Sequence, residues 1–594
     1  MEKRTLLAVV LSVAVIMGFY YVQNTLYRPA APAAAGEGRQ EEAPPASSLV
    51  LQPARPDGTA PEERADEGVL AEGPREEQRI TVDTPLVTAV LTNAGGDLVS
   101  YKLKEHRDQE GLVEMILSGA AEGHAFTVAF GGLEAKPVSA LFHVNRRDDY
   151  TVEFYRDFEV RVQGETARFR LTKRYDFRPE EYMFELTVTL DGGHSVSSVN
   201  FGGAAYTLAF GPQIGPKFEQ LDQRYDYRQY YTFTNGKRKQ EKVNERAPTL
   251  INSRISWAAI AGKYFTFIAI PDATQYETAF SVTPEAGMPQ PSRFYMIRPA
   301  LKGSRTVDTF RFYLGPKTQK DLGIYDNGNN SFKLREMQLI KILTTSGILG
   351  PVEAIFKWLL MIFYRVIPNY GVAIMLLTLL VKLLMFPLTK KSSEATLRMQ
   401  ALSPKIKDLQ TKYKDNPAKL NAEMAEFYKK EGYNPVSGCL PMLLQLPLFI
   451  AMYNLFNNHF DLRGAMFIPG WIPDLSLPET VWNFAPFRIP LLGWSDLRLL
   501  PFIYLGSQLL YGKVTQTPDQ QGNAQMKMML YAMPAVFFFV LYNVPSGLLL
   551  YWIMSNLLTM VQQVGINKYL AKRRAHTPAA APEPVIAPRK KRKR

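Results

Sequence analysis

The sequence lacks several features that define common classes of protein. It contains one cysteine among 594 residues, which excludes a disulfide scaffold, an all-cysteine metal site and a CxxC redox pair. It contains no Walker loop, no GxSxG, no HExxH and no EF-hand pattern. Four histidines fall in β-type segments without metal-ligand spacing: His106, His124, His143 and His194. We therefore predict no catalytic residue, no metal site and no small-molecule cofactor.

Charged residues are missing from long stretches, and the first of these is at the N-terminus. Residues 6–22 are apolar and follow Lys3 and Arg4, which predicts a transmembrane anchor over residues 1–27. The small residues 33–35 allow a cleaved signal peptide as the alternative. In either case Lys3 and Arg4 stay in the cytoplasm and the following residues are exported. Residues 28–78 are rich in Pro, Ala, Glu and Gly without apolar periodicity, which predicts a disordered linker.

Residues 79–334 carry the periodicity of β-strands. Apolar residues alternate with others from Tyr182 to Leu190, which predicts a strand with one buried face. Alternating segments on either side of Gln163-Gly164 predict a hairpin. Repeated strands and turns over this range predict a large antiparallel β-sandwich, which folds without disulfides because it contains no cysteine.

The remaining uncharged stretches predict a membrane part. Glu353, Lys357 and Arg365 share one helical stripe of an otherwise apolar segment, so we expect an amphipathic helix on the membrane surface within residues 335–369. Residues 528–567 are uncharged, and one helix of that length would be about 60 Å long, twice the hydrocarbon thickness. We therefore predict a helical hairpin broken at 543–547. With spans at 370–387, 437–457 and 499–512, the chain would have six transmembrane helices, five of them in a core over 370–567.

The formal net charge of +13 lies in two segments. Residues 388–436 carry +4, residues 568–594 carry +9, and the rest of the chain is neutral. A topology with both termini in the cytoplasm places both segments on the cytoplasmic side, as the positive-inside rule requires. Residues 79–334 and the Trp-rich residues 460–497 are then external. The charge therefore needs no nucleic-acid function.

The first basic segment has the pattern of a helical hairpin. Asn416-Pro417 reads as an N-cap followed by proline at the first helical position, and Gly432 as a C-terminal stop. A preceding helix is expected over residues 394–412. The alternative is a solvated loop that only obeys the charge asymmetry. The candidate basic contact residues are Lys405, Lys407, Lys412, Lys414, Lys429 and Lys430.

Lys382 is the only charged residue of the predicted span 370–387. A lysine at the centre of a span costs about 2.5–3.5 kcal/mol on insertion scales, which favours a functional role. The alternative is snorkelling, because Pro387 is only about 8 Å further along the helix axis. Polar residues of this and the other spans could form a wet cavity open to the cytoplasm and to lipid: Thr378, Gln445, Gln508, Tyr551, Trp552, Ser555 and Asn556.

Four ordered motifs in the spans resemble the YidC/Oxa/Alb family of membrane protein insertases. They are MFPLTK at 385–390, MQALSPKI at 399–406, NPVSGCLP at 434–441 with QLPLF at 445–449, and PSGL at 545–548 with YW at 551–552 and SN at 555–556. The anchor and the exported β domain are similar to the Gram-negative YidC type with a large periplasmic domain. That domain resembles sugar-binding β-supersandwiches, which by itself implies no sugar activity.

The resemblance implies a nucleotide-independent insertase and chaperone of the bacterial inner membrane. It would insert and fold membrane proteins, alone or with the Sec translocon, through a hydrophilic intramembrane groove. The family's basic groove residue matches Lys382, where many relatives have arginine; lysine is a movable point charge rather than a fork of donors. Substrate-contacting positions match Thr378, Tyr551 and Trp552, the last replacing a usual tyrosine.

The resemblance also implies partners. The hairpin over 388–436 resembles the loop that receives nascent membrane proteins. The tail resembles ribosome-contacting tails, with binding to anionic lipids as the alternative. Its terminal basic residues are Arg589, Lys590, Lys591, Arg592, Lys593 and Arg594.

Two other function classes remain for comparison. A polytopic small-solute transporter would need a substrate-sized site at the midplane, and the spans show no internal duplication. A membrane-anchored carbohydrate-binding or carbohydrate-active protein would, as an enzyme, need paired carboxylates or a His/Asp arrangement within 79–334.

Overall fold

The computed structural model describes residues 68–69, 73–108, 111–116, 124–162, 165–193, 198–211, 215, 227–251, 254–272, 276–284, 291–343, 349–414, 416–433, 440–489, 493–515 and 524–576. The predicted anchor over 1–27, most of the linker and the six basic residues that end the tail lie outside these ranges.

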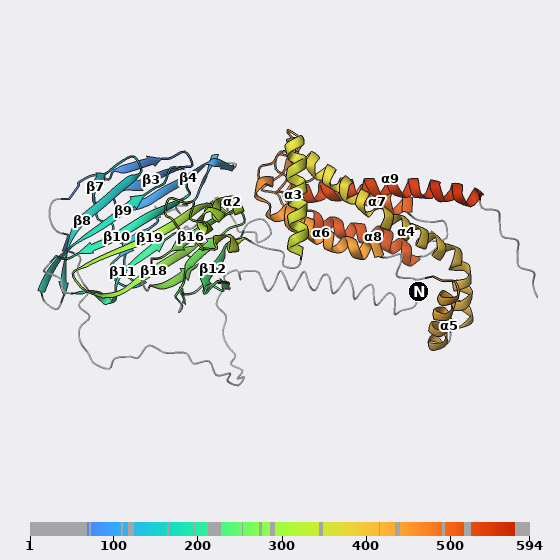
Figure 1. The fold of residues 1–594 in the computed structure, drawn as a ribbon, viewed down its shortest axis with the longest axis horizontal. Helices are drawn as coiled ribbons and strands as arrows, with labels where there is room; N and C mark the ends of the chain where they lie inside the picture. The colour runs from blue at the N-terminus through green and yellow to red at the C-terminus, as the bar shows by residue number, and fades with distance from the viewer. Residues whose placement is uncertain are drawn as a thin grey trace, which may run out of the picture. The chain divides into compact units, whose positions relative to one another are not determined.

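Three antiparallel sheets make up the first folded part (Figure 1). The largest has ten strands in the order β1 (Gly68–Val69), β8 (Thr151–Val162), β9 (Glu165–Asp176), β10 (Met183–Asp191), β19 (Arg305–Pro316), β16 (Phe265–Ile270), β15 (Trp257–Ala261), β12 (Gln229–Thr234) and β13 (Lys237–Glu241), with β7 (His143–Arg146) paired to β8.

Two smaller sheets complete this domain. The five-stranded sheet runs β14 (Thr249–Ile251), β17 (Glu277–Ser281), β18 (Arg293–Lys302), β11 (Ser198–Phe210) and β6 (Thr127–Ala129). The four-stranded sheet runs β2 (Arg79–Asp83), β3 (Val87–Thr92), β4 (Asp97–Asp108) and β5 (Gly111–Glu114). Short helices follow at α2 (Gln319–Gly323), η1 (Ile324–Asp326) and η2 (Leu339–Ile342).

The sheets share one aromatic core, as expected of a sandwich. The ring centroid of Phe126 lies 5.4 Å from that of Phe184 on β10, 4.5 Å from Phe312 on β19 and 5.5 Å from Phe210 on β11. Because β10 and β19 belong to the largest sheet and β11 to the five-stranded one, these rings join two sheets. The predicted all-β sandwich is confirmed.

The predicted hairpin is also present, and so is the predicted strand with one buried face. Strands β8 and β9 pair from Thr151↔Asp176 to Val162↔Glu165, around a turn outside the described residues. On β10, Phe184 and Leu186 are buried as expected, but Met183 and Thr187 on the other face are buried too. The predicted buried face is confirmed, and the opposite face is partly covered, because Glu185 and Thr189 on it are only half-buried.

A buried ion pair holds the loop before β4 to β9. The Lys173 ammonium donates to the carbonyl oxygens of Gly95 at 3.0 Å and Phe126 at 2.8 Å, and pairs with the carboxylate of Asp97. The Lys173 side chain is fully buried, and this burial lowers its pKa. The other oxygen of Asp97 lies 3.3 Å from Nδ1 of His124. Every proton of the ammonium therefore has an acceptor, which offsets its desolvation.

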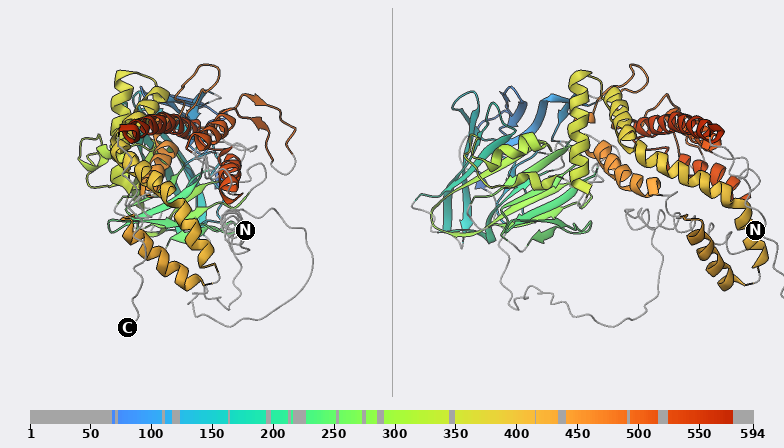
Figure 2. Two further views of the ribbon diagram at one scale, coloured as in Figure 1. Left: turned by 90° about the vertical axis from the view of Figure 1, so that its right-hand side faces the viewer. Right: turned by 45° about the vertical axis from the view of Figure 1, so that its right-hand side comes forward.

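The second folded part is helical, and its helices are labelled in Figure 1. They are α3 (Gly350–Val366), α4 (Tyr370–Lys412), α5 (Pro417–Lys430), α6 (Leu440–Asn458), α7 (Leu500–Thr515), α8 (Ala524–Leu541) and α9 (Ser546–His576), with η5 (Phe460–Leu462) and the short strands β20 (Trp482–Asn483) and β21 (Asp496–Leu497) between α6 and α7. Helix α9 packs against α4 and α7, and α5 packs against α4 (Figures 1 and 2).

The break between α8 and α9 confirms the predicted helical hairpin. Contacts at this break account for the PSG motif at 545–547. The backbone N–H of Ser546 donates to the carbonyl of Leu477 at 2.8 Å, and that of Gly547 donates to the carbonyl of Leu475 at 2.9 Å. A Cβ on Gly547 would lie 3.1 Å from the Leu475 oxygen, closer than an ordinary contact. The turn therefore needs a small residue at the start of α9.

Helix α4 differs from the prediction. We expected a span ending at Pro387 and a separate helix from residue 394, but one helix of 43 residues continues through Pro387 and Pro404. Proline removes one backbone donor, and helices in membranes tolerate this where neighbouring side chains satisfy the freed groups. The basic segment therefore begins as a direct extension of the span.

Two helices within the described ranges are long and apolar enough to cross a membrane, over Tyr370–Ala395 and Ser546–Tyr569, and a shorter apolar segment runs over Tyr531–Leu541. The count of six spans stays a prediction.

We predict that Lys173→Met destabilises the β domain by about 3–5 kcal/mol, because it leaves the Asp97 carboxylate buried without a cation. Pulse proteolysis of the full-length protein across a urea series measures this loss. The matched control is Arg168→Met on the same strand: its partner Glu159 lies 2.8 Å away, but the Arg168 side chain is 70% exposed, so a change within about 0.5 kcal/mol is expected. Equal midpoints for the two variants would contradict the assignment.

Candidate functional site

Polar side chains that the sequence placed on separate spans meet where α9 packs on α7. The amide Nδ2 of Asn556 donates to the hydroxyl of Ser507 at 3.0 Å and to Oε1 of Gln508 at 2.7 Å. The Ser507 hydroxyl in turn donates to the carbonyl of Tyr504 at 2.7 Å. These bonds form a connected network between two apolar helices, where an unpaired amide would be costly.

Aromatic rings extend this contact one turn earlier along α9. The ring of Trp552 stacks on Phe449 of α6 with centroids 4.9 Å apart and lies 5.6 Å from Tyr504 of α7. Tyr551 is buried, with its ring 6.1 Å from Phe456. The predicted pair Tyr551-Trp552 therefore lies against α6 and α7.

Helix α4 contributes Thr378 and Lys382, one turn apart. Thr378 is buried and its hydroxyl donates to the carbonyl of Ile374 at 2.7 Å, so it is satisfied within its own helix. Lys382 is half-buried and lies near the middle of the apolar stretch Tyr370–Ala395. Its ammonium forms no hydrogen bond or ion pair with any residue that the structure describes. The next two residues, Leu383 and Leu384, are exposed.

A second contact joins α9 to α4 at Lys382 itself. The amide Nε2 of Gln562 donates to the backbone carbonyl of Lys382 at 3.0 Å. Further along, the Ser393 hydroxyl donates to Oε1 of Gln563 at 3.1 Å, and the ammonium of Lys390 lies 4.7 Å from the ring centroid of Tyr569. Sequence reasoning missed Gln562. Its spacing of seven residues from Ser555 and eleven from Tyr551 puts it on their helical stripe, which is the signal that could have found it.

Gln445 makes no hydrogen bond in either of these contacts. Gln445 on α6 is half-buried, and no hydrogen bond joins it to another residue in the described ranges. The polar side chains therefore meet at two places on α9: Asn556 with α7, and Gln562 with α4.

The basic segment forms a helical hairpin, and the loop alternative was wrong. Asn416 caps α5 by accepting from the N–H of Lys419 at 3.1 Å, and Gly432 has the left-handed φ of +61° that ends the helix. The two arms are joined by an ion pair of 3.0 Å between Lys405 and Glu431. The basic side chains Lys405, Lys412, Lys414, Lys429 and Lys430 are exposed; Lys407 lies on α4 with its side chain outside the described set.

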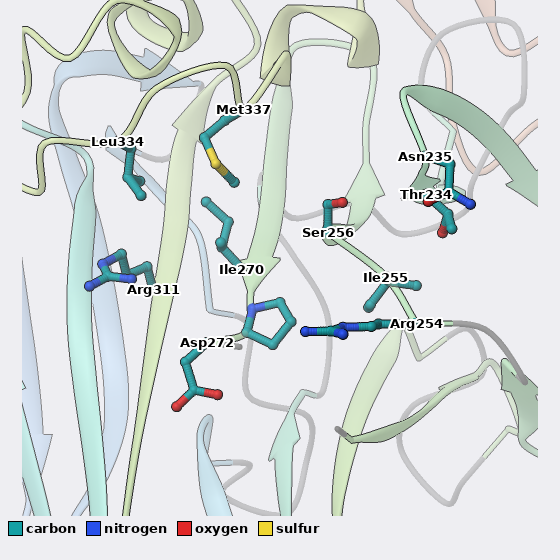
Figure 3. A pocket seen from close by; sticks show the side chains of 11 residues that line it. Thr234, Asn235, Arg254, Ile255, Ser256, Ile270, Asp272, Arg311, Leu334 and Met337 are labelled. Atoms are coloured by element: carbon teal, nitrogen blue, oxygen red, sulfur yellow. The ribbon is translucent and has the colours of Figure 1, made fainter. Parts of the chain in front are cut away.

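A cavity of about 720 Å³ lies in the β domain (Figure 3). Arg254 and Arg311 line opposite sides of it, and its lining carries one carboxylate, Asp272. That carboxylate accepts from the backbone N–H of Thr309 at 3.3 Å, and Arg311 pairs with Glu185 at 3.1 Å. A single carboxylate is not the paired arrangement that glycoside hydrolysis requires. Within the described residues, no group of three His, Cys, Asp or Glu could hold a metal ion.

Comparisons with known proteins match both folded parts. The family model described as "60Kd inner membrane protein" matches residues 362–573, and the model described as "YidC periplasmic domain" matches residues 79–339. The chain is 44% identical to a Treponema denticola protein named membrane protein insertase YidC, over 96% of this chain and all of that protein. It is 36% identical to the protein of that name from Treponema pallidum, over 96% and 99% of the two chains.

One solved structure, titled as an active YidC insertase with its first transmembrane domain resolved, aligns with 83% of this chain and 94% of its own at 16% identity. The TM-score is 0.34.

We predict that Asn556→Leu loosens the contact between α7 and α9. The variant loses two side-chain hydrogen bonds, which average about 0.6 kcal/mol each between membrane helices, so a loss of about 1 kcal/mol is expected. An SDS titration of the full-length protein, followed by the folded fraction, measures it. The control is Asn567→Leu near the end of the same helix, where the side chain is exposed and its bond with Gln563 is open to solvent; a clearly smaller shift of the midpoint is expected. A parent-like midpoint for Asn556→Leu would show that the network contributes nothing.

Proposed function

The chain belongs to the YidC family of membrane protein insertases, and we propose that it moves the polar flank of an incoming segment into the bilayer along the polar side chains that α4, α7 and α9 share. It is an inner-membrane protein with a periplasmic all-β domain, and an insertase rather than an enzyme. The observation that carries the proposal is Lys382, a cation in an apolar helix whose ammonium has no partner among the described residues.

Electrostatics supports a binding role for Lys382. An isolated charge at the centre of a span costs about 2.5–3.5 kcal/mol on insertion scales, and a cation without a local partner keeps that cost until an anion arrives. A carboxylate in the flank of an incoming segment would supply the anion, and their attraction is stronger there than in water because the surroundings are less polar. The flexible lysine can follow the carboxylate as it moves.

Uncharged polar groups would receive the rest of the flank. Gln508 and Asn556 offer hydrogen-bonding atoms between α7 and α9, which lowers the cost of taking peptide groups out of water. The apolar part of the incoming segment would leave sideways past the exposed Leu383 and Leu384. Helix α7 has 16 residues, about 24 Å, which is less than the hydrocarbon thickness of about 30 Å. A bilayer that thins around it would shorten the path of the polar flank.

A six-span topology fits this role. The spans would be the N-terminal anchor, α4, α6, α7, α8 and α9, with both termini in the cytoplasm. The positive-inside rule supports this arrangement because it places the segments of +4 and +9 on the cytoplasmic side.

The cytoplasmic side would receive the substrates, which are nascent membrane proteins. The exposed lysines of the hairpin formed by α5 and the end of α4 would attract acidic flanks and the ribosome. The basic tail, 589–594, would attract ribosomal RNA or anionic lipids, both by salt-dependent attraction. Insertion would proceed by this protein alone or with the Sec translocon.

We predict that Lys382→Ala impairs insertion of a small two-span substrate with an acidic flank, and that Lys382→Arg retains most of it because the charge is kept. Depletion of the native protein, followed by complementation and protease protection of the substrate, measures insertion. The control is Lys513→Ala, an exposed lysine at the end of α7, for which full insertion is expected. Full insertion by Lys382→Ala would remove the role assigned to this charge.

We also predict that reversing the charge of Lys429 and Lys430 together to Glu weakens capture of ribosome–nascent chain complexes, because both exposed cations become anions. Co-sedimentation at low and high salt measures capture, and the defect is expected to be largest at low salt. The matched control reverses the charge of Lys237 and Lys239 to Glu; both are exposed lysines of the periplasmic β13. An equal effect of the two pairs would argue against reception at the hairpin.

A further inference from the structure

Two neighbouring glutamines on α9 differ in how their amides are satisfied. Gln563 uses both ends: its Oε1 accepts from the Ser393 hydroxyl at 3.1 Å, and its Nε2 donates to Oδ1 of Asn567 at 3.0 Å. Gln562 uses one end: its Nε2 donates to the backbone carbonyl of Lys382, whereas its Oε1 is buried and has no hydrogen-bond partner among the residues that the structure describes. A buried carbonyl oxygen without a donor is costly and calls for an explanation.

The orientation of the Gln562 amide is fixed by its partner. A backbone carbonyl oxygen can only accept a hydrogen bond, so the end of the amide that faces Lys382 has to be the NH₂ group. The other end is then the acceptor Oε1. The unpaired acceptor is therefore a consequence of the bond to α4 and is not removed by turning the amide over.

The same place on α4 carries the second unused group. The backbone of Lys382 holds Gln562, while the ammonium of Lys382 forms no bond with any residue in the described ranges. One contact between α4 and α9 thus joins two residues that each carry a group without a partner in the described ranges: the acceptor of Gln562 and the cationic donor of Lys382. A peptide segment offers the complementary pair, since each peptide unit has an N–H donor and an acidic side chain supplies an anion.

We propose that Gln562 is a second substrate-binding residue, whose Oε1 accepts an amide N–H from the polar flank of the incoming segment while Lys382 binds its carboxylate. This rests on the insertion path proposed above and adds a rule for specificity. Lys382 discriminates by charge. Gln562 recognises uncharged polar flanks, including those rich in Asn or Gln, which give Lys382 no anion to bind.

The alternative is that Gln562 only clamps α9 to α4. A clamp would affect the insertion of every substrate in the same proportion, because it would act through the helix packing. A binding residue would affect substrates according to the chemistry of the flank. Two reporters separate these roles: a two-span protein with three Asp in its translocated flank, and the same protein with three Asn at those positions.

The experiment measures insertion of both reporters by the full-length protein carrying Gln562→Leu, Gln563→Leu or Lys382→Ala. We expect Gln562→Leu to lower insertion of the Asn reporter by roughly threefold, the scale of one hydrogen bond within a membrane, and to change the Asp reporter less. Lys382→Ala is expected to show the reverse order. Gln563→Leu, which removes an amide with both ends paired, is expected to affect the two reporters equally.

The outcomes distinguish this proposal from the insertion path on which it rests. Equal losses on the two reporters with Gln562→Leu would show a clamp, and no loss would show no role; either overturns the proposal while the path stands. Parent-like insertion of the Asp reporter by Lys382→Ala would instead overturn the path. If Gln562→Leu does not accumulate, a photo-crosslinker at position 562 on an arrested Asn reporter decides the question: crosslinks from 562 exceeding those from 563 support binding, and their absence contradicts it.

Discussion

An unpaired lysine in an apolar helix is the constraint on which the membrane part depends. Lys382 lies in a stretch apolar enough to span the bilayer, and its ammonium has no hydrogen bond or ion pair with any described residue. Such a charge is tolerated only where water or polar atoms are near, so the helices around it cannot pack as a uniformly apolar bundle. The hydrogen bonds of Asn556 and Gln562 fit that requirement, since each joins α9 to a neighbouring helix through polar atoms.

The β domain also buries a lysine, but there the ammonium is paired with acceptors. Lys173 is also a lysine in apolar surroundings, but it has a carboxylate and two carbonyl oxygens around its ammonium. This fully paired cation fixes the loop before β4 against β9. Its ammonium has no N–H donor left to bind a ligand. The contrast supports different roles for the two lysines: the satisfied one is structural, and the unsatisfied one is available to a substrate.

Features of the fold that depend on residues close together in the chain could be predicted from the sequence. The N-cap at Asn416, the break before Ser546 and the hairpin of β8 and β9 all follow from neighbouring residues. Predictions were less successful for features that depend on contacts between residues far apart in the chain. Pro387 did not end α4, and Met183 and Thr187 are buried on the face of β10 that the alternating pattern does not predict as buried. The contact between Gln562 and Lys382 joins residues 180 positions apart, so no local pattern specifies it.

The central claim is that Lys382 binds the acidic flank of a substrate directly. A charge swap tests it: Lys382→Glu is combined with a substrate whose flanking Asp residues are replaced by Lys, and insertion is measured for all four combinations of protein and substrate. With a direct contact, Lys382→Glu blocks insertion of the acidic substrate, and this variant inserts the substrate with the basic flank better than the parent protein does. Equal insertion of the basic substrate by both proteins would contradict a direct contact.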